Sequence, residues 1–291
     1  MGLGSNAVDC VLQLTRFPVH GGKQRLESRT RLGGGQVATA AVLCARFGLK
    51  VRYVGRVGDD ADGRFMMDLL SREGLDLSCV EVVAGGESQT ACILVDPLGE
   101  RTILWNRDPK LLSRPGEIQP ESIQVGEILH LDSHDQVGAI QAARLAREVG
   151  MKVSLDIDKI QPEVEQLLEL VDFLIPTLSF VQAYTGLTDS EQALLQLDRS
   201  VPGFLAATAG SRGCLAVWEG QVHEVPGFAV EPTDTTGAGD VFHGAFVYAL
   251  FQKWSVRQSL LFANAAAAIS TTRLGSQGGI PSLAEVEALL A

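Results

Sequence analysis

The sequence predicts an α/β protein whose mainly parallel central sheet is covered by helices on both faces. In the central third of the chain, short apolar runs typical of buried strands alternate with longer runs typical of helices. Strands are expected at 128–131, 153–156 and 173–175, with helices at 136–149 and 164–170. Because strand–helix alternation of this kind builds a parallel sheet with helices on its two faces, we expect a three-layer α/β/α core.

A second observation predicts a small β sheet beside this core. Residues 10–32 are polar and alternating, with proline and glycine turn signals. Residues 86–107 alternate in the same way on both sides of the turn Asp96-Pro97-Leu98-Gly99, which is typical of a hairpin. We expect the two segments to form a β lid, within a single domain that covers residues 1–291.

The remaining elements follow from the same patterns. Gly33-Gly34-Gly35 enters an apolar helix that ends at Phe47, where Gly48 is a typical C-cap. Gly2-x-Gly4-x-x-Ala7 resembles a dinucleotide fingerprint, but we reject it because the residues before it leave no room for the buried strand that this motif needs. The other expected elements are a strand at 51–57 followed by a turn and a helix, strands at 203–207, 214–218 and 221–225, helices at 241–250 and 258–272, a loop at 275–279 and a last helix from Pro281.

Composition and charge exclude several classes of function. Of the 291 residues, 46% are hydrophobic, which is enough for a sizeable core. The formal net charge of -11 argues against nucleic acid or an anionic membrane as a partner, because both require a basic surface. The five cysteines are scattered without a Cys-x-x-Cys pair, which indicates free thiols in a cytoplasmic protein. No signal peptide is expected, because the first residues show no basic region followed by an apolar core. No transmembrane helix is expected, because no apolar run approaches ~20 residues.

The most informative stretch is Asp234-Thr235-Thr236-Gly237-Ala238-Gly239-Asp240, which we interpret as a turn that opens a helix. The two threonines can cap the helix, and the two glycines let the backbone approach a ligand. The first N–H groups lie at the positive end of the helix dipole, which suits phosphate. Asp240 would repel phosphate, so we expect it to act as a base toward an attacking hydroxyl, with an ordinary capping role as the alternative.

This stretch, followed by an apolar helix that contains glycine, resembles the signature of the ribokinase-like (PfkB) carbohydrate kinases. The resemblance implies the ribokinase-like fold and transfer of the ATP γ-phosphoryl group to a hydroxyl of a small sugar. Asp240 would take the hydroxyl proton, while the N–H groups of Gly237, Ala238 and Gly239 would hold the developing charge. Mg²⁺ would bridge the phosphates, and closure of the lid would exclude water. The open edge of the lid invites pairing, so we expect a homodimer joined through the lids.

The same resemblance implies a site for the acceptor sugar. Asp9 matches a Gly-x-x-x-x-Asp motif at the end of the first strand, whose Asp binds substrate hydroxyls; an Asp in a surface turn is the alternative. The glycine pair before the first helix lies against the sugar in the family, which often has Asn where Thr39 stands. The hairpin end is expected to reach the ligand, although a solvated Arg107 is an equal alternative. The residues expected at the acceptor are Asp9, Gly34, Gly35, Thr39, Asn106 and Arg107.

The nucleotide site is implied by a Thr-x-Gly-x-x-Gly motif after the strand at 203–207. A nucleophile elbow around Ser211 is rejected, because a hairpin and not a helix follows the serine. Asn264 matches a family position near adenine, with a polar helix surface as the alternative. Asp234 and the C-terminal loop resemble parts of a site for a monovalent cation such as K⁺. The residues expected to contact ATP are Thr208, Gly210, Ser211, Gly213, Thr236 and Asn264.

Polar side chains also gather near the predicted carboxyl ends of the parallel strands, where ligands bind in such sheets. They are expected to face substrate or the water around magnesium, or to cap helices, Asp135 above all. These residues are Asp132, His134, Asp135, Asp156 and Asp158.

One departure from the family leaves alternatives open. Many members carry Asn-x-x-Glu after the strand at 173–175, where the Glu helps to organise magnesium and phosphate. Here Thr177 and Phe180 occupy the two positions, so metal organisation differs or activity is reduced. The sulfofructose kinases of the family also lack this Asn and Glu, and their sequence motifs resemble residues 33–41 and 239–244. The resemblance implies a related substrate class. A nucleoside kinase and a non-catalytic binding protein on a kinase scaffold are the alternatives.

Overall fold

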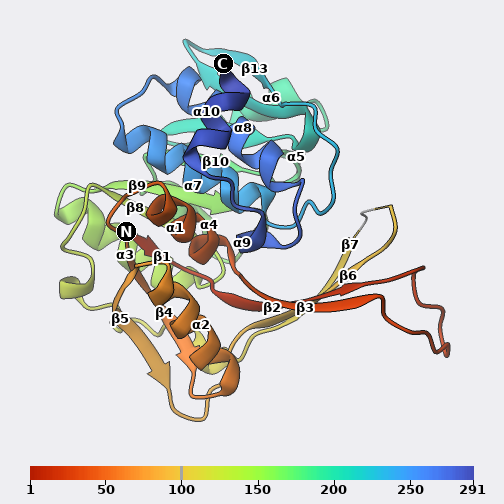
Figure 1. Cartoon of the computed structure of the whole chain (residues 1–291). Helices are drawn as coiled ribbons and strands as arrows, with labels where there is room; N and C mark the ends of the chain where they lie inside the picture. Colours follow the sequence, from red (N-terminus) through yellow and green to blue (C-terminus); the bar gives the residue numbers. More distant parts are fainter. Residues whose placement is uncertain (99–100) are drawn as a thin grey trace.

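The computed structural model describes residues 1–98 and 101–291 (Figure 1). Within these residues the chain forms a nine-stranded sheet and a separate four-stranded sheet. The large sheet has the order β13-β12-β11-β10-β9-β8-β1-β4-β5 and carries helices on both faces. The predicted fold class, a three-layer α/β/α core with a small β sheet beside it, is therefore confirmed.

The large sheet is parallel from β5 to β11, and the hairpin β12–β13 continues it in antiparallel order. At its centre, β1 has only two residues, yet it pairs with β4 on one side and β8 on the other. The expectation that no strand fits before Gly4 was therefore wrong. The strands are β1 (Gly2–Leu3), β4 (Arg52–Gly58), β5 (Asp76–Val83), β8 (Ile128–Asp132), β9 (Lys152–Ile157), β10 (Phe173–Pro176), β11 (Phe204–Thr208), β12 (Gly213–Trp218) and β13 (Gln221–Pro226).

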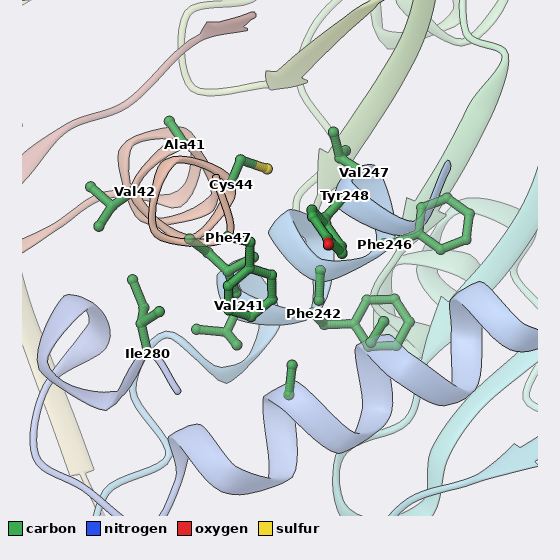
Figure 2. Close-up of a cluster of buried hydrophobic side chains, with 14 of the residues drawn as sticks. Ala41, Val42, Cys44, Phe47, Val241, Phe242, Phe246, Val247, Tyr248 and Ile280 are labelled. Carbon is green, nitrogen blue, oxygen red and sulfur yellow. The ribbon is translucent and has the colours of Figure 1, made fainter. Parts of the chain in front are cut away.

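One face of this sheet is covered by a large apolar cluster built around α1 (Gln36–Arg46) and α7 (Ala238–Phe251). The two helices approach closely because Gly244 has no side chain: a Cβ there would lie 2.8 Å from the backbone oxygen of Ala40. Figure 2 shows the side chains that meet at this crossing. The other helices on this face are α2 (Ala61–Arg72), α8 (Val256–Ser270) and α10 (Leu283–Leu290).

The opposite face packs on a second apolar cluster, to which four helices contribute. Two of them, α5 and α6, were not predicted, and neither was strand β5. All three are short or polar, so their periodicity is weak. The four helices are α3 (Gln136–Glu148), α4 (Val164–Leu168), α5 (Leu178–Thr185) and α6 (Ser190–Asp198).

The four-stranded sheet, which we call the lid sheet, has the order β3-β2-β6-β7 and extends away from the large sheet (Figure 1). Its core is a small cluster on one face, formed by Val11, Ala91, Ile93 and Val95. Gly99, part of the predicted turn, lies outside the described residues. The strands are β2 (Ala7–Gln13), β3 (Ser28–Gly34), β6 (Thr90–Val95) and β7 (Arg101–Asn106).

Two local predictions in the C-terminal third were wrong. The segment expected as a loop at 275–279 contains the one-turn helix α9 (Ser276–Gly279). The two threonines do not cap α7, because its N-cap is Gly237, in the left-handed conformation with φ 80°. A threonine is disfavoured at such a φ, so the glycine takes the cap position. No helix in the described part of the chain is long and apolar enough to span a membrane.

Candidate active site

The carboxyl ends of β8 and β9 and the first turn of α7 bring several carboxylates together. Asp132 ends β8, where its two oxygens accept the backbone N–H groups of Ser5 (2.7 Å) and His134 (3.0 Å). Asp156 lies near the end of β9 and Asp240 in the first turn of α7. Because parallel strands end at one edge of the sheet, residues far apart in the sequence meet there.

Asp240 has a pKa well above its usual value. Burial is the largest cause, and the charges of Asp156, Asp9, Asp132 and Asp158 raise the pKa further. The positive end of the α7 dipole favours the ionised carboxylate, but burial and, after it, the neighbouring carboxylates raise the pKa of Asp240 in the ligand-free protein. A carboxylate with a raised pKa is a stronger base, which suits proton abstraction from a hydroxyl.

The glycine loop ahead of α7 is held against the C-terminal segment. Asp234 is buried, and its two oxygens accept the N–H groups of Thr236 (2.9 Å) and Gly275 (2.8 Å). A Cβ on Gly237 would lie 2.5 Å from Cβ of Ser276, so this glycine allows the two segments to touch. Gly239 differs, because no described atom lies within 4 Å of the place where its Cβ would be. A ligand can therefore approach the backbone at Gly239.

In the part of the chain that the structure describes, the hydroxyl of Thr236 is unsatisfied beside this loop. Its Oγ1 is buried, yet it has no hydrogen-bond partner among the described residues. A buried hydroxyl of this kind is costly unless a ligand or water satisfies it. Together with the open backbone at Gly239 and the helix N-terminus, it forms a set of donors suited to an anion.

The predicted nucleotide motif lies at the end of β11, on the same edge of the sheet. Thr208 is the last residue of β11, and Gly210 and Ser211 follow in an exposed turn. Gly213 begins β12, where a Cβ would collide with the backbone of β13. The motif therefore shapes a tight turn that is exposed at the carboxyl edge of the sheet.

Asn264 does not lie on a polar helix surface. It is buried in α8, and its Nδ2 donates to the backbone oxygens of Val225 (3.0 Å) and Pro226 (3.2 Å). Its amide nitrogen is thus engaged in holding the end of β13. Any contribution of Asn264 to nucleotide binding would act through this segment.

Asp9 is buried in the middle of β2, so the alternative of a surface turn is wrong. Ser276 of α9 donates its hydroxyl to Oδ2 of Asp9 at 3.2 Å. Burial raises the pKa of Asp9 to about 6, the serine opposes this shift, and the charge of Asp234 adds to it. Gly34 leaves space for the carboxylate, because a Cβ there would overlap it.

Other polar groups near the start of α1 lack partners. Gly35 has φ 93° and packs on the backbone of Asn6. The Thr39 hydroxyl and both amide atoms of Gln277 are buried with no hydrogen-bond partner within residues 1–98 and 101–291. The unpaired amide of Gln277 lies against Gly33, next to the Asp9 region.

One face of the lid sheet contacts segments at the carboxyl edge of the large sheet. Trp105 of β7 makes an edge contact with His134 (centroids 6.4 Å apart), and the Lys159 ammonium lies 5.6 Å from its ring. Arg101, at the other end of β7, donates to the Thr235 hydroxyl. The lid sheet is therefore folded toward the edge that carries the carboxylates.

The structure does not place Asn106 with the other predicted acceptor residues. Asp9, Ala91 and Trp105 form one row of the lid sheet, and Asn106 stands in the next row with an exposed side chain. Adjacent rows point to opposite faces. Arg107 is half-buried, and its Nη1 has no hydrogen-bond partner in the described chain, so the alternative of a solvated hairpin tip does not hold.

Within residues 1–98 and 101–291, no group of three or more His, Cys, Asp or Glu side chains could hold a metal ion. Thr177 caps α5 by accepting the N–H of Phe180 (3.2 Å), and the Phe180 ring is buried against Tyr184. The role of Asp135 as a helix cap is confirmed, because it accepts the N–H of Gly138 at the start of α3.

Several residues at the site were missed by sequence reasoning. The strongest available signal was His243, a polar residue inside the apolar run of α7. Ser276 follows a glycine in a glycine-rich segment, which hints at a close backbone approach. Trp105 belongs to the hairpin end that was expected to reach the ligand, but its face could not be assigned without the strand register. The missed residues are Gln36, Lys159, His243, Ser276 and Gln277.

Comparisons with known proteins agree with this geometry. A family model described as "pfkB family carbohydrate kinase" matches residues 3–283. Ribokinase of Bacillus subtilis (strain 168) is 30% identical over 297 residues, covering 99% of this chain and 98% of the relative. Fructokinase-1 of Zea mays is 28% identical over 283 residues, covering 88% of each chain. The structure of Arabidopsis thaliana ribokinase complexed with ribose and ATP matches with a TM-score of 0.87 and 25% identity, covering 99% and 97% of the two chains.

Proposed function

Because this chain belongs to the pfkB family of carbohydrate kinases, we propose that it transfers the γ-phosphoryl group of ATP to a hydroxyl of a small sugar or sugar derivative. The observation that carries the proposal is the position of Asp240. It lies at the start of α7, directly after an open glycine turn, and its pKa is raised partly by the carboxylate of Asp9. A phosphate-accepting helix start, a base and a hydroxyl-binding carboxylate thus occupy one site.

In the proposed reaction, Asp9 accepts a hydrogen bond from a sugar hydroxyl and orients the acceptor. Asp240 takes the proton of the attacking hydroxyl, whose oxygen forms the new bond to phosphorus. The N–H groups of Gly237, Ala238 and Gly239 lie at the positive end of α7, where they stabilise negative charge on the transferred group. The proton moves to the carboxylate of Asp240, and ADP leaves with the electron pair of the broken phosphorus–oxygen bond.

ATP would be held along the carboxyl edge of the large sheet. The unpaired Thr236 hydroxyl and the exposed turn at Gly210 and Ser211 support this placement. Mg²⁺ would be bound through the phosphates, since the described residues provide no protein cage and Phe180 replaces an acidic residue. A monovalent cation such as K⁺ would lie beside Asp234, where the loops at 234–236 and 275 meet.

The lid sheet would close the site and join two subunits. Residues of β7 are exposed, among them Leu104 on the face opposite Asp9, and β7 is an unpaired edge of its sheet. Exposed edges with apolar side chains favour pairing between copies. A sample that stays monomeric at high concentration in light scattering would contradict the homodimer. A cytoplasmic location is supported by the five free cysteines.

The first experiment is ATP consumption with a panel of acceptors. The panel contains D-ribose, D-fructose, further aldoses and ketoses, sulfosugars, keto-deoxy acids and nucleosides. Turnover with one sugar class supports the proposal and names the substrate class, including the class related to sulfofructose. Turnover with nucleosides alone would indicate a nucleoside kinase. Sugar binding without any turnover would indicate a binding protein on a kinase scaffold, the alternative that Phe180 motivates.

Substitution of the proposed base tests the mechanism. Asp240→Asn keeps the shape and removes the base, so kcat should fall by roughly 10²–10⁴-fold. ATP affinity should be retained or improve, because a negative charge near the phosphates is lost. A kcat within a few-fold of the native value would rule out Asp240 as the base.

Asp9→Ala tests the acceptor site separately. It should weaken sugar binding by about 1.5–3 kcal/mol, the usual contribution of a hydrogen bond to a charged group. ATP binding should change little, because Asp9 lies on the lid sheet. Isothermal titration with each ligand decides this, and equal losses for both ligands would contradict the assignment.

A further inference from the structure

Asp156 is held by contacts on both of its oxygens. Gln36, the first residue of α1, donates its Nε2 to Oδ2 of Asp156 at 3.1 Å. Nε2 of His243 lies 3.2 Å from the other oxygen, Oδ1. His243 is one turn after Asp240 on α7 and only 2% exposed. Asp156 therefore connects α1, β9 and α7, and its contact on α7 is one turn from the proposed base.

The surroundings of His243 indicate which of its nitrogens carries hydrogen. A carboxylate can only accept, so the 3.2 Å contact with Asp156 is favourable when Nε2 carries the hydrogen. Nδ1 is buried without a hydrogen-bond partner in the described part of the chain. A hydrogen on Nδ1 would be an unsatisfied buried donor, which costs free energy. The neutral form with hydrogen on Nε2 fits both observations.

A second histidine packs on the first without adding charge. The rings of His130 and His243 are 5.4 Å apart, and Nδ1 of His130 lies 3.3 Å from the Ser154 hydroxyl. Burial lowers the pKa of His130 well below its usual value, so this ring stays neutral. His243 thus has one charged neighbour within ion-pair distance among the described residues, and that neighbour is Asp156.

The charge of Asp156 acts on the proposed base. Among the four carboxylates whose charge raises the pKa of Asp240, Asp156 has the largest effect, and the others are Asp9, Asp132 and Asp158. The pKa of Asp158 is itself raised by burial and then by the charge of Asp156, while His134 and Lys159 oppose this shift. When several carboxylates share a site, the group with the best donors stays ionised and its neighbour takes the proton.

We propose that His243 is a positioning residue that keeps Asp156 ionised and thereby makes Asp240 the carboxylate that takes the acceptor proton. The inference rests on the proposed kinase function for its catalytic meaning. Its structural part, the distribution of the proton between two carboxylates, can be measured without any substrate.

The test uses paired variants of the full chain. His243→Leu removes the N–H that faces Asp156, while His243→Gln can still present one. Protein labelled with carbon-13 at the Asp carboxyl carbon is titrated by NMR, with Asp156→Asn and Asp240→Asn as assignment standards. In His243→Leu we expect the midpoint of Asp156 to rise by about 1 unit, because an ionised carboxylate loses a donor. The midpoint of Asp240 should fall, and His243→Gln should restore both.

His130→Leu is the matched control, since it alters the stacked ring without touching Asp156. It should lower the melting temperature and leave both midpoints in place. Identical midpoints in the native protein and His243→Leu would overturn the proposal. So would equal shifts in His243→Leu and His130→Leu, because the effect would then be one of packing.

Kinetics give the catalytic readout once a sugar from the panel is turned over. A base with a lower pKa is weaker, so the plateau of kcat against pH should fall about threefold to tenfold in His243→Leu. The acidic limb of the same pH profile should move to lower pH. KM for ATP and sugar should not change. An unchanged kcat plateau and acidic limb in an active enzyme would overturn the proposal. Absence of turnover in the native protein would instead be a failure of the proposed function, and the NMR result would still decide the proton distribution.

Discussion

The middle and the first turn of α7 lie in opposite surroundings. Toward its middle, Phe246 is fully buried between Phe173 and Phe204, with ring centroids 5.9 and 6.3 Å away. At its first turn, Asp240 is surrounded by other carboxylates and has a raised pKa. One helix therefore carries a region that stabilises the fold and a region that destabilises it.

The difference shows how the fold supports its site. Burial of aromatic and aliphatic side chains around α1, α7 and α8 supplies the free energy that holds the helix start in place. The carboxyl edge of the large sheet, by contrast, keeps several carboxylates close together, and their mutual repulsion is unfavourable without a ligand. Strained or charged groups persist at active sites because the surrounding structure fixes them. Substitutions in the two regions should therefore change stability in opposite directions.

The largest effect is expected in the apolar region. Phe246→Ala should lower the free energy of unfolding by about 3–5 kcal/mol, because it leaves a cavity beneath the sheet. Phe251, at the end of the same helix, is 42% exposed, and Phe251→Ala should cost less than about 1 kcal/mol. Urea unfolding of both variants checks this. Similar losses would show that the middle of α7 is not the stabilising region.

A smaller effect of opposite sign is expected at Asp9. Its pKa is about 6 in the folded protein and near 3.8 when unfolded, so the native protein loses stability as pH rises between these values. Asp9→Asn lacks this ionisation, so it should be more stable than the native protein by up to about 3 kcal/mol at pH 7. The difference should vanish near pH 4. Urea unfolding at both pH values decides it, and a variant that is less stable at pH 7 would contradict the prediction.

The smallest effect separates two glycines of one loop. Gly237→Ala should cost about 1–3 kcal/mol, because of its positive φ and the overlap with Ser276. Gly239→Ala should be neutral or stabilise α7 by up to about 1 kcal/mol, because the site is open and helical. Turnover should nevertheless fall in Gly239→Ala, since the methyl group would stand where phosphate approaches. Thermal unfolding and kcat, measured on the same samples, test this. Full activity of Gly239→Ala would show that phosphate does not bind at this position.

Most of the fold could be predicted because the hydrophobic periodicity of each strand or helix lies within its own short segment of sequence. The strands and helices between residues 128 and 176 each carry their own apolar pattern, and strand–helix alternation then fixes a parallel sheet. α5 and α6 escaped prediction because their patterns are short, and β1 because two residues carry no pattern at all. β1 forms only because β4 and β8 provide partners on both sides.

The site was harder to predict, because it depends on register and electrostatics. The prediction grouped Asn106 with Asp9, although strand alternation places Trp105 on the face of Asp9. The face depends on the pairing of β2 with β6, which the sequence of neither strand reveals. The raised pKa of Asp240 was not predicted, because its burial and the carboxylates around it come from other elements of the chain. The contact between His243 and Asp156 likewise joins residues 87 positions apart in the numbering.

The pH dependence of the stability of Asp240→Asn tests the account most directly. It shows whether the native carboxylate at this position lowers the stability of the fold. The free energy of unfolding is measured by urea for the native protein and the variant at pH 4 and pH 8. We expect the variant to be more stable than the native protein at pH 8, and the difference to shrink at pH 4. The reason is that ionisation of a carboxyl with a raised pKa lowers the free energy of unfolding of the native protein. A variant that is less stable at pH 8 would contradict the account, since Asp240 would then be a structural residue of the helix start.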